Sequence, residues 1–227
     1  MLSDVCVYFH IVVPDTAIAA IKDIVTNKLS IFLMVYARIT FMSTNVKFEQ
    51  YANLLRQWSG RMNLVAPSTL SDIETRHIAD SAQLADVLPR DVEIIDLGSG
   101  AGFPGVVLAI LGWRVTCIES IGKKVAFLTA VKEELKLDNL TIYHGRVEDY
   151  VRHLPAKTDK FVFTARAFAS LTKIMDYVAR TKYQLFLLKG REISAEVADA
   201  KRKYKFSYEL TPSKTGDGFI ISVCFDR

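Results

Sequence analysis

Apolar positions recur at helical spacing in two stretches of the first half of the chain. Between residues 45 and 60 they stand three or four residues apart, and Gly60 is a typical helix stop. Residues 68–88 repeat the helical spacing. The pattern therefore predicts a helical cap over residues 42–90.

Beyond residue 90, short apolar runs alternate with helical patterns. The runs that predict strands are Val92–Leu97, Arg114–Glu119, Leu140–Tyr143, Phe161–Thr164 and Tyr183–Leu188, and the helical patterns between them are Phe103–Leu111, Lys123–Leu137, Val147–Leu154 and Leu171–Ala179. This alternation predicts a parallel sheet with right-handed crossovers and helices on both faces. The last two runs, Tyr204–Leu210 and Phe219–Phe225, are too close for a crossover helix and predict an antiparallel hairpin. We therefore expect an α/β domain over residues 91–227, built on a seven-stranded mixed sheet.

Residues 1–41 do not share this organisation. Val5–Val13 has the pattern of an apolar strand and Ile18–Val25 that of a short amphipathic helix. The nine-residue apolar run Leu29–Ala37 is too short to cross a bilayer, and no basic segment or cleavage site accompanies it. We expect an atypical extension, with the functional domain starting near Met42.

Composition narrows the class of protein, and the distribution of charge adds a candidate partner. The 227 residues are 50% hydrophobic and 24% charged, as in an ordinary globular protein, and three distant cysteines without metal-ligand spacing indicate a reducing, cytoplasmic location and no metal. The net charge of +4 is uneven: residues 42–150 carry 11 basic and 14 acidic groups, and residues 151–227 carry 15 and 8. The excess in the last third predicts a surface that faces nucleic acid, although a solvated helix end explains its dense cluster, Lys201 to Lys205, equally well.

A glycine-rich turn between the first predicted strand and helix is the strongest local signal. Residues 93–105 have the sequence EIIDLGSGAGFPG. Asp96, Gly98, Gly100 and Gly102 fit the DxGxGxG loop of S-adenosylmethionine-dependent methyltransferases, and the same segment also satisfies the GxGxxG of dinucleotide dehydrogenases. Glycines here let the backbone turn tightly and approach a ligand.

Two later strand ends could complete a nucleoside site. Glu119 follows Gly100 by 19 residues, where a carboxylate can accept hydrogen bonds from ribose hydroxyls of either cofactor. Val147 and Glu148 could bracket an adenine, although acids at a helix N-terminus are favourable without a ligand. Only 108 residues follow Glu119, and they end in the hairpin, which leaves no second mononucleotide-binding half. We therefore favour S-adenosylmethionine over a dinucleotide-dependent oxidoreductase.

The loop after the fourth predicted strand indicates the reaction. Residues 164–171, TARAFASL, contain neither a [DN]PP[YF] motif to accept a proton from an exocyclic amine nor a cysteine to attack a pyrimidine. Guanine N7 needs neither device, because its lone pair carries no proton. We therefore predict in-line methyl transfer to N7 without a general base, in which alignment contributes up to ~7–11 kcal/mol.

These segments together resemble a known family, the bacterial 16S ribosomal RNA guanine-N7 methyltransferases, also called glucose-inhibited division protein B. The matching segments, within about residues 46–227, are WSGRMNL at 58–64, RHIADS at 76–81, DLGSGAGFPG at 96–105, ESIGKK at 119–124, RVE at 146–148, RAFASL at 166–171 and KG at 189–190. The resemblance implies a Rossmann-like class I methyltransferase fold, S-adenosylmethionine as cofactor with S-adenosylhomocysteine as product, and no metal. It also implies 16S rRNA or the 30S subunit as partner, no membrane association and a monomer. By the same resemblance, the cofactor contacts are Gly98, Phe103, Val147, Glu148 and Arg166.

Three positions depart from the family pattern. Glu119 stands where Asp is more usual, and Thr164 and Ala165 precede Arg166 where Ser is common. Residues 1–41 match nothing in the family.

The remaining candidates concern the RNA. Arg76, His77 and Asp80 lie on one side of a predicted helix, and we hypothesise that Asp80 or His77 borders the guanine pocket, with Arg166 as a further positioning residue. A lone histidine such as His77 is otherwise a structural hydrogen-bonding group. The predicted phosphate contacts are Arg76, Lys189, Lys201, Arg202 and Lys203. A catalytically inactive RNA-binding protein with the same fold remains an alternative.

Overall fold

The computed structural model describes residues 42–156 and 158–226 and divides the chain into two compact units, Met1–Asn45 and Val46–Arg227. The elements predicted within residues 1–41, Val5–Val13 and Ile18–Val25, lie outside the described residues. The fold and the site both belong to the second unit.

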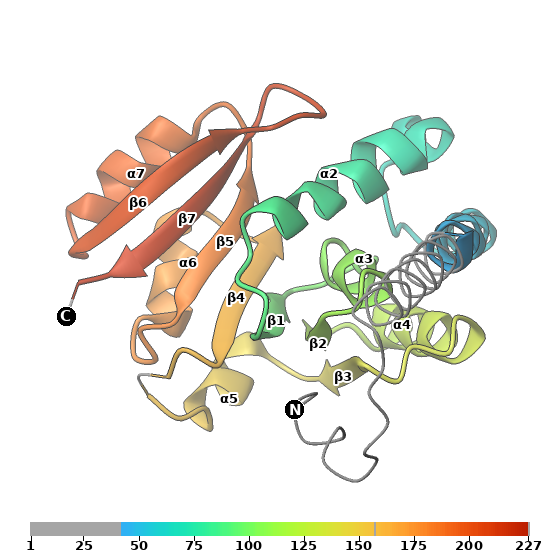
Figure 1. The fold of residues 1–227 in the computed structure, drawn as a ribbon, viewed down its shortest axis with the longest axis horizontal. Helices are drawn as coiled ribbons and strands as arrows, with labels where there is room; N and C mark the ends of the chain where they lie inside the picture. The colour runs from blue at the N-terminus through green and yellow to red at the C-terminus, as the bar shows by residue number, and fades with distance from the viewer. Residues whose placement is uncertain (1–41, 157, 227) are drawn as a thin grey trace, which may run out of the picture. The chain divides into compact units, whose positions relative to one another are not determined.

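A seven-stranded mixed sheet with strand order β3-β2-β1-β4-β5-β7-β6 forms the centre of this unit (Figure 1). Its strands are β1 (Glu93–Leu97), β2 (Arg114–Glu119), β3 (Leu140–His144), β4 (Phe161–Arg166), β5 (Gln184–Lys189), β6 (Phe206–Pro212) and β7 (Phe219–Phe225). The first five pair in parallel, and β7 runs antiparallel to both β5 and β6. The predicted fold class is confirmed. β1 and β4 are adjacent and parallel, and from this pair the strands are added in opposite directions, β2 and β3 on one side and β5 on the other. Sheets of this kind bind ligands at the carboxyl ends of the strands at such a change of order.

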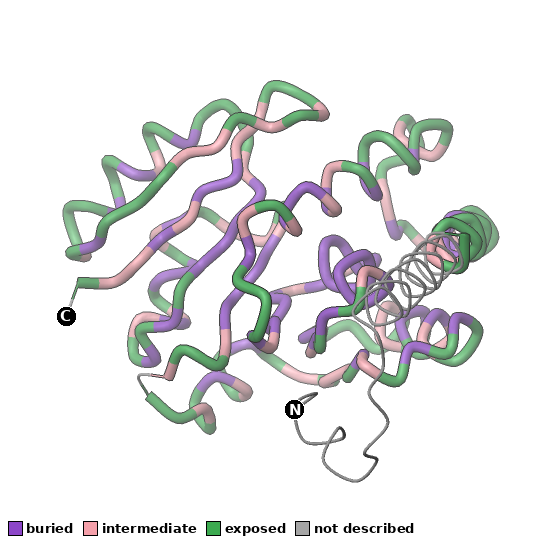
Figure 2. The backbone as a smooth tube through the Cα atoms, viewed as in Figure 1, coloured by how far each residue is buried: buried purple, intermediate pink, exposed green. Residues whose placement is uncertain are grey.

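Helices cover both faces of the sheet. They are α3 (Gly105–Ile110) and α4 (Gly122–Glu134) on one face and α5 (Val147–Arg152), α6 (Leu171–Val178) and α7 (Ile193–Lys201) on the other. Because side chains alternate across a strand, Ile94 joins the core with α3 and α4, whereas Ile95 joins the core with α6 and α7. Both faces of the central strands are thus covered, and most of their residues are buried, as the purple colour in Figure 2 shows. Helix α7 is missing from the sequence prediction, although Ile193, Val197 and Ala200 form its buried side.

The segment predicted as a helical cap contains helical residues, but its second part is not one regular α-helix. Residues 42–59 are helical, and Tyr51 and Leu55 are fully buried. The second part passes from a 3-10 helix (Pro67–Asp72) through a π-helix (Ile73–Ala79) and α2 (Asp80–Ala82) to a 3-10 turn (Gln83–Asp86). Turns of π-helix occur often at functional sites, and this one carries Arg76 and His77. Among the described helices, none combines the length and the apolar character that a bilayer crossing requires.

Candidate functional site

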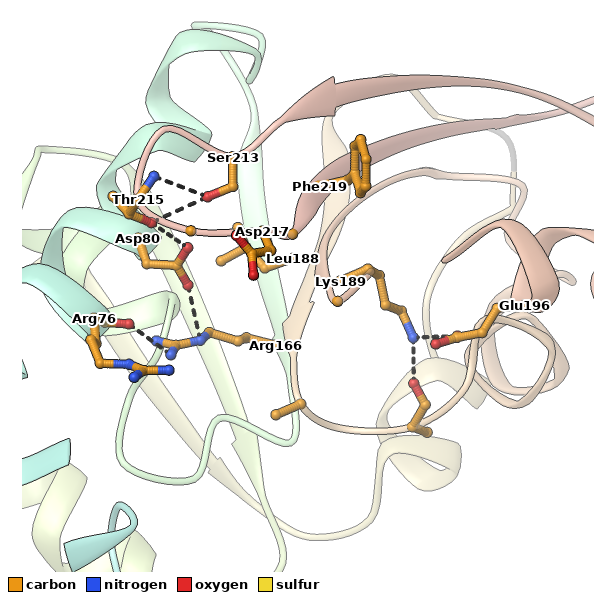
Figure 3. A pocket seen from close by; sticks show the side chains of 15 residues that line it. Arg76, Asp80, Arg166, Leu188, Lys189, Glu196, Ser213, Thr215, Asp217 and Phe219 are labelled. Atoms are coloured by element: carbon orange, nitrogen blue, oxygen red, sulfur yellow. Dashed lines mark hydrogen bonds and ion pairs between the residues drawn. The ribbon is translucent and has the colours of Figure 1, made fainter. Parts of the chain in front are cut away.

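Two cavities lie at the carboxyl ends of the parallel strands and share Ala167, in the loop after β4. The glycine-loop cavity encloses about 300 Å³, and its lining includes Gly98, Glu119, Lys124, Arg146, Val147, Glu148, Phe168 and Tyr177. The hairpin cavity encloses about 630 Å³ (Figure 3). Its lining includes Arg76, Asp80, Arg166, Lys189, Glu196, the β6–β7 loop residues Ser213, Thr215, Gly216, Asp217 and Gly218, and Phe219 at the start of β7.

The glycine loop has the backbone conformation that its sequence predicts. Gly98, Gly100 and Gly102 have φ values of +65°, +58° and +94°, in the region that favours glycine. A Cβ atom on Gly98 would also overlap the ring of Phe168, which lines the same cavity. At Gly98, therefore, both the backbone and the space require glycine.

Asp96 lies beneath this loop, outside the cavity lining. It is fully buried; its Oδ2 accepts from the Gly105 N–H at 3.1 Å and its Oδ1 from the Thr164 hydroxyl at 3.2 Å. Burial raises the pKa of Asp96 to about 6, although these hydrogen bonds oppose the rise. Asp96 therefore ties the glycine loop to β4, a supporting role that its prediction as a cofactor contact did not include.

The other predicted cofactor residues divide into two groups. Gly98, Glu119, Val147 and Glu148 line the glycine-loop cavity, as the sequence predicted for one ligand. Other predicted cofactor residues do not line it: Asp96, Gly100, Gly102, Phe103 and Arg166.

Glu119 is held in place by the backbone around it. The residue is only 5% exposed, and its carboxylate accepts hydrogen bonds from the N–H groups of Gly100 at 2.9 Å and Ile121 at 2.8 Å. One bond reaches each oxygen, so each retains a lone pair for a hydroxyl donor.

Phe168 and Tyr177 are lining residues that sequence reasoning missed. Their ring centroids lie 6.0 Å apart, and both rings border the glycine-loop cavity. The preceding Ala167 has a φ of +51°, a conformation that a non-glycine residue adopts infrequently. The only signal in the sequence was the position of an aromatic residue just after a strand.

Arg166, at the end of β4, links the strand to the helical cap. Its Nε lies 3.2 Å from Asp80 Oδ2, and its Nη2 lies 2.9 Å from both the Arg76 carbonyl and His77 Nδ1. Its guanidinium also lies over the ring of Phe103, 5.6 Å from the centroid. Nη1 makes only a 3.5 Å bond to the His77 carbonyl, so one of its N–H groups has no partner among the described residues.

His77 orients Arg166 and has no free lone pair. Because Nδ1 faces an Arg166 donor, the proton of the neutral ring belongs on Nε2, which donates to Thr69 Oγ1 at 2.8 Å. The Thr69 hydroxyl in turn donates to Ala66 O. Burial, and then the nearby Arg166 charge, lowers the pKa of His77 to about 4, so the ring is neutral at pH 7. His77 also stacks on Phe103, with centroids 5.0 Å apart.

Asp80 and His77, which we hypothesised to border the guanine pocket, lie in different places. Asp80 lines the hairpin cavity, whereas His77 is 9% exposed and lies behind Arg166, outside the lining. His77 is a positioning residue.

Lys189, predicted as a phosphate contact, has two partners within the protein. Its side chain lines the hairpin cavity but is 9% exposed, and Nζ lies 2.6 Å from Ala169 O and 2.7 Å from Glu196 Oε2 (Figure 3). The same Glu196 oxygen accepts from the Leu171 N–H at 2.6 Å. Lys189 and Glu196 therefore fix the loop after β4, and the ammonium group is directed toward these partners.

Gln83 joins the cap to the β6–β7 loop, which nothing in the sequence indicated. Its Nε2 donates to Asp80 Oδ1 at 2.8 Å and to Ser213 Oγ at 3.0 Å, and its Oε1 accepts from the Lys214 N–H at 3.0 Å. Thr215 Oγ1 also donates to Asp80 Oδ1, at 2.9 Å. The three bonds to Ser213, Lys214 and Thr215 connect residues 130 to 135 positions apart and close one side of the hairpin cavity.

Comparison with known proteins places this arrangement in a family. Residues 44–215 match the model of the family described as rRNA small subunit methyltransferase G. The chain belongs to this family. Proteins named ribosomal RNA small subunit methyltransferase G are 39% identical over 183 residues in Hyphomonas neptunium, covering 78% of this chain and 85% of the relative, and 33% identical over 226 residues in Bradyrhizobium sp. (strain ORS 278), covering 94% and 98%.

Solved structures agree on the fold. A mutant of MtNAS superposes with a TM-score of 0.55 at 17% identity, covering 83% of this chain and 76% of that one. A protein from Corynebacterium glutamicum gives a TM-score of 0.53 at 15% identity, covering 78% and 91%. At these identities the likeness shows the fold alone.

The basic cluster of this family member is distant from both cavities. Phe206, just after the cluster, pairs with Phe225 beside the amino end of β5, whereas Pro212 lies at the carboxyl end next to Phe219. Lys201, Arg202 and Lys203 therefore lie near the amino ends of the parallel strands, whereas both cavities lie at the carboxyl ends. Their charges are also partnered: Lys201 lies over the Tyr208 ring, Arg202 Nη1 is 3.2 Å from Asp199 and Lys203 Nζ is 2.7 Å from Asp176. They are not part of the surface that contains the site.

Within residues 42–156 and 158–226, no group of three or more His, Cys, Asp or Glu side chains is arranged to hold a metal ion.

Proposed function

We propose that this chain transfers the methyl group of S-adenosylmethionine to N7 of a guanine in the 16S rRNA of the small ribosomal subunit. The observation that carries the proposal is the meeting of two cavities at Ala167, beside Arg166. A methyltransferase needs one site for the methyl donor and one for the acceptor, and the two must share a boundary for in-line transfer. Family membership supports rRNA of the small subunit as the acceptor.

The glycine-loop cavity suits S-adenosylmethionine, which supplies a methyl group on a positively charged sulfur. Glu119 would accept from the ribose hydroxyls through its free lone pairs. Gly98 would let the backbone approach the ligand, and Val147 and Glu148 would bracket the adenine. The remaining N–H of Arg166 Nη1 would bind the carboxylate of the methionine part, at the boundary with the acceptor.

The acceptor side supports guanine N7 because the candidate bases that are at least partly buried, Asp80, Glu196 and His77, are already committed. Asp80 accepts three hydrogen bonds, Glu196 is held by Lys189 and the Leu171 N–H, and the His77 lone pair faces Arg166. An N7 lone pair needs no proton removed before it attacks. The chain's contribution is then to hold the base in line and to exclude water, not to supply a general base.

The test is methyl transfer from labelled S-adenosylmethionine to small-subunit RNA prepared from a strain that lacks this protein. Naked 16S rRNA, an assembly intermediate and the complete 30S subunit are assayed in parallel, and the modified base is then mapped. We expect one labelled guanine, methylated at N7, in at least one of these substrates. Absence of transfer to all three, or transfer to another atom, would overturn the proposal.

A further inference from the structure

Resting on the proposed function, we propose that Asp217 selects the acceptor base. In this assignment the Asp217 carboxylate accepts hydrogen bonds from N1–H and the 2-amino group of a guanine bound in the hairpin cavity. Asp217 lies in the β6–β7 loop, beyond the residues matched by the family model.

Among the described residues that line the hairpin cavity, three side chains are carboxylates, and only one of them is available. Asp80 already accepts from Gln83, Thr215 and Arg166. Glu196 is occupied by Lys189 and a backbone N–H. Asp217, by contrast, has only a 3.7 Å ion pair with Arg191, and the two side chains are 78% and 76% exposed. Such an exposed pair is weak and easily exchanged for a ligand.

The loop that carries Asp217 is anchored on both sides, although its tip is exposed. The Ser213 N–H donates to Gly218 O at 2.9 Å and closes the loop, and Gln83 binds the Lys214 N–H from the cap. Gly218 approaches Lys189 so closely that a Cβ there would be 2.5 Å from the Lys189 carbonyl oxygen. The Asp217 side chain, drawn on the pocket side of this loop in Figure 3, thus projects from a fixed backbone.

The position of Asp217 relative to the glycine-loop cavity suits the geometry of guanine. The donors N1–H and 2-amino lie on the Watson–Crick edge of the purine, and N7 lies on the adjoining Hoogsteen edge. The loop forms one wall of the hairpin cavity, and the boundary with the glycine-loop cavity, at Ala167, forms another. A guanine whose donor edge meets Asp217 therefore keeps N7 free to face this second wall, toward the methyl donor.

The same contact excludes the other purine. Adenine presents an unprotonated N1 where guanine presents N1–H, so a carboxylate would face a lone pair and leave both groups unpaired. The cavity volume of about 630 Å³ lies within the usual range for small-molecule sites, so a base taken out of its stack has room to enter.

The test pairs a change in the protein with a change in the base. Wild-type protein and Asp217→Asn are assayed in single turnover on small subunits reconstituted with guanine or inosine at the target position. Inosine keeps N7 and N1–H and lacks only the 2-amino group. We expect wild type to favour guanine over inosine by about 10-fold or more, and Asp217→Asn to lower the rate on guanine about 10-fold and bring the ratio close to one.

Two control variants make the result specific. Asp199→Asn changes an exposed aspartate that is paired with Arg202 at the distant edge, and it should leave both the rate and the ratio unchanged. Arg191→Gln removes the exposed partner of Asp217 and should retain the preference for guanine. S-adenosylmethionine affinity should be the same in all variants.

A guanine-to-inosine ratio that is the same in Asp217→Asn and wild type would overturn the assignment of Asp217. Failure of the wild type to methylate subunits containing guanine would overturn the proposed function instead, so the two failures are distinguishable.

Discussion

The two cavities are built in different ways, although they share Ala167. The glycine-loop cavity is formed by turns that directly follow β1, β2, β3 and β4, and its special geometry belongs to the backbone. The hairpin cavity is closed by side chains from the cap, two strand ends and the β6–β7 loop. Its central residue, Asp80, bonds to groups 3, 86 and 135 positions away: Gln83, Arg166 and Thr215.

This difference separates what is common to a fold from what is particular to a reaction. A site made by turns after parallel strands is repeated wherever the strand order is repeated. A site made by long-range polar contacts depends on several side chains at once, and removal of one leaves buried partners unsatisfied. We therefore expect changes in the glycine loop to affect cofactor binding alone and changes around the hairpin loop to affect the RNA step alone.

The largest expected effect is at the glycine loop, with Gly98→Ala. The added Cβ would force an alanine to adopt a φ of +65° and would overlap the Phe168 ring in the cavity. We expect S-adenosylmethionine affinity, measured by calorimetry, to fall by about 1,000-fold, which is roughly 4 kcal/mol.

Gly112→Ala is the matched control. Gly112 also has a positive φ, +103°, but a Cβ there meets nothing within 4 Å and lies outside the glycine-loop cavity lining. It should lose roughly 1–2 kcal/mol of stability from backbone strain and keep its affinity. Equal affinity losses in the two variants would show that backbone strain, and not the cavity, sets cofactor binding.

The second prediction uses the opposite pH responses of the buried groups beside the two cavities. The folded-state pKa of His77, about 4, lies below its unfolded value near 6.5, so the unfolded chain binds the extra proton between these values. The stability that neutral His77 contributes is therefore present above pH 6.5 and is lost as pH falls toward 4. The pKa of Asp96 is raised to about 6, so lowering the pH through this value relieves a buried charge and stabilises the fold.

Comparison of wild type with His77→Gln isolates the histidine, because the contribution of Asp96 is common to both proteins. From denaturant unfolding at pH 7 and pH 4, we expect the stability of wild type relative to His77→Gln to decrease by up to roughly 3 kcal/mol at the lower pH. The stability of wild type relative to Asp96→Asn should instead increase at the lower pH, because protonation of Asp96 removes a buried charge. A pH-independent difference for His77→Gln would mean that the ring is not held neutral by its burial beside Arg166.

The third prediction concerns the wall of the hairpin cavity, where two glycines of one loop provide variant and control. A Cβ at Gly218 would meet the Lys189 carbonyl at 2.5 Å and displace the loop, whereas at Gly216 it would meet nothing within 4 Å. We expect Gly218→Ala to raise KM for the RNA substrate about 10-fold, a loss of roughly 1.4 kcal/mol, without changing cofactor affinity. Gly216→Ala should behave as wild type. A loss of cofactor affinity in Gly218→Ala would show that the two cavities are coupled.

The contrast between the cavities also explains how far the sequence could predict the structure. Hydrophobic alternation and turn residues are local, so the seven-stranded mixed sheet and the positions of Gly98 and Glu119 could be predicted from them. The ion pair of Lys189 with Glu196 depends on helix α7, which was not predicted, so the sequence did not indicate this intramolecular partner of the predicted phosphate contact. The Gln83 bridge joins two segments without any shared periodicity or spacing, and only the folded chain brings them together.

The smallest effect is expected at the basic cluster, which dominated the charge asymmetry of the sequence. Lys201, Arg202 and Lys203 lie at the amino ends of the parallel strands, and each already has an acidic or aromatic partner. Phosphate contacts made near the hairpin cavity would not require them. We expect the triple change of these residues to Gln to lower RNA affinity by no more than about 3-fold at 150 mM salt, because an exposed ion pair is worth only about 0–1 kcal/mol.

Arg76→Gln is the comparison variant, because Arg76 lines the hairpin cavity and its side chain adds positive charge beside the proposed acceptor. Filter binding across a salt series should show a lower slope of affinity against salt for Arg76→Gln and a nearly unchanged slope for the triple variant. The reverse result would place the RNA at the amino ends of the parallel strands, beside Lys201, Arg202 and Lys203. The excess charge of residues 151–227 would then mark a second contact surface, separate from the cavities that carry out the reaction.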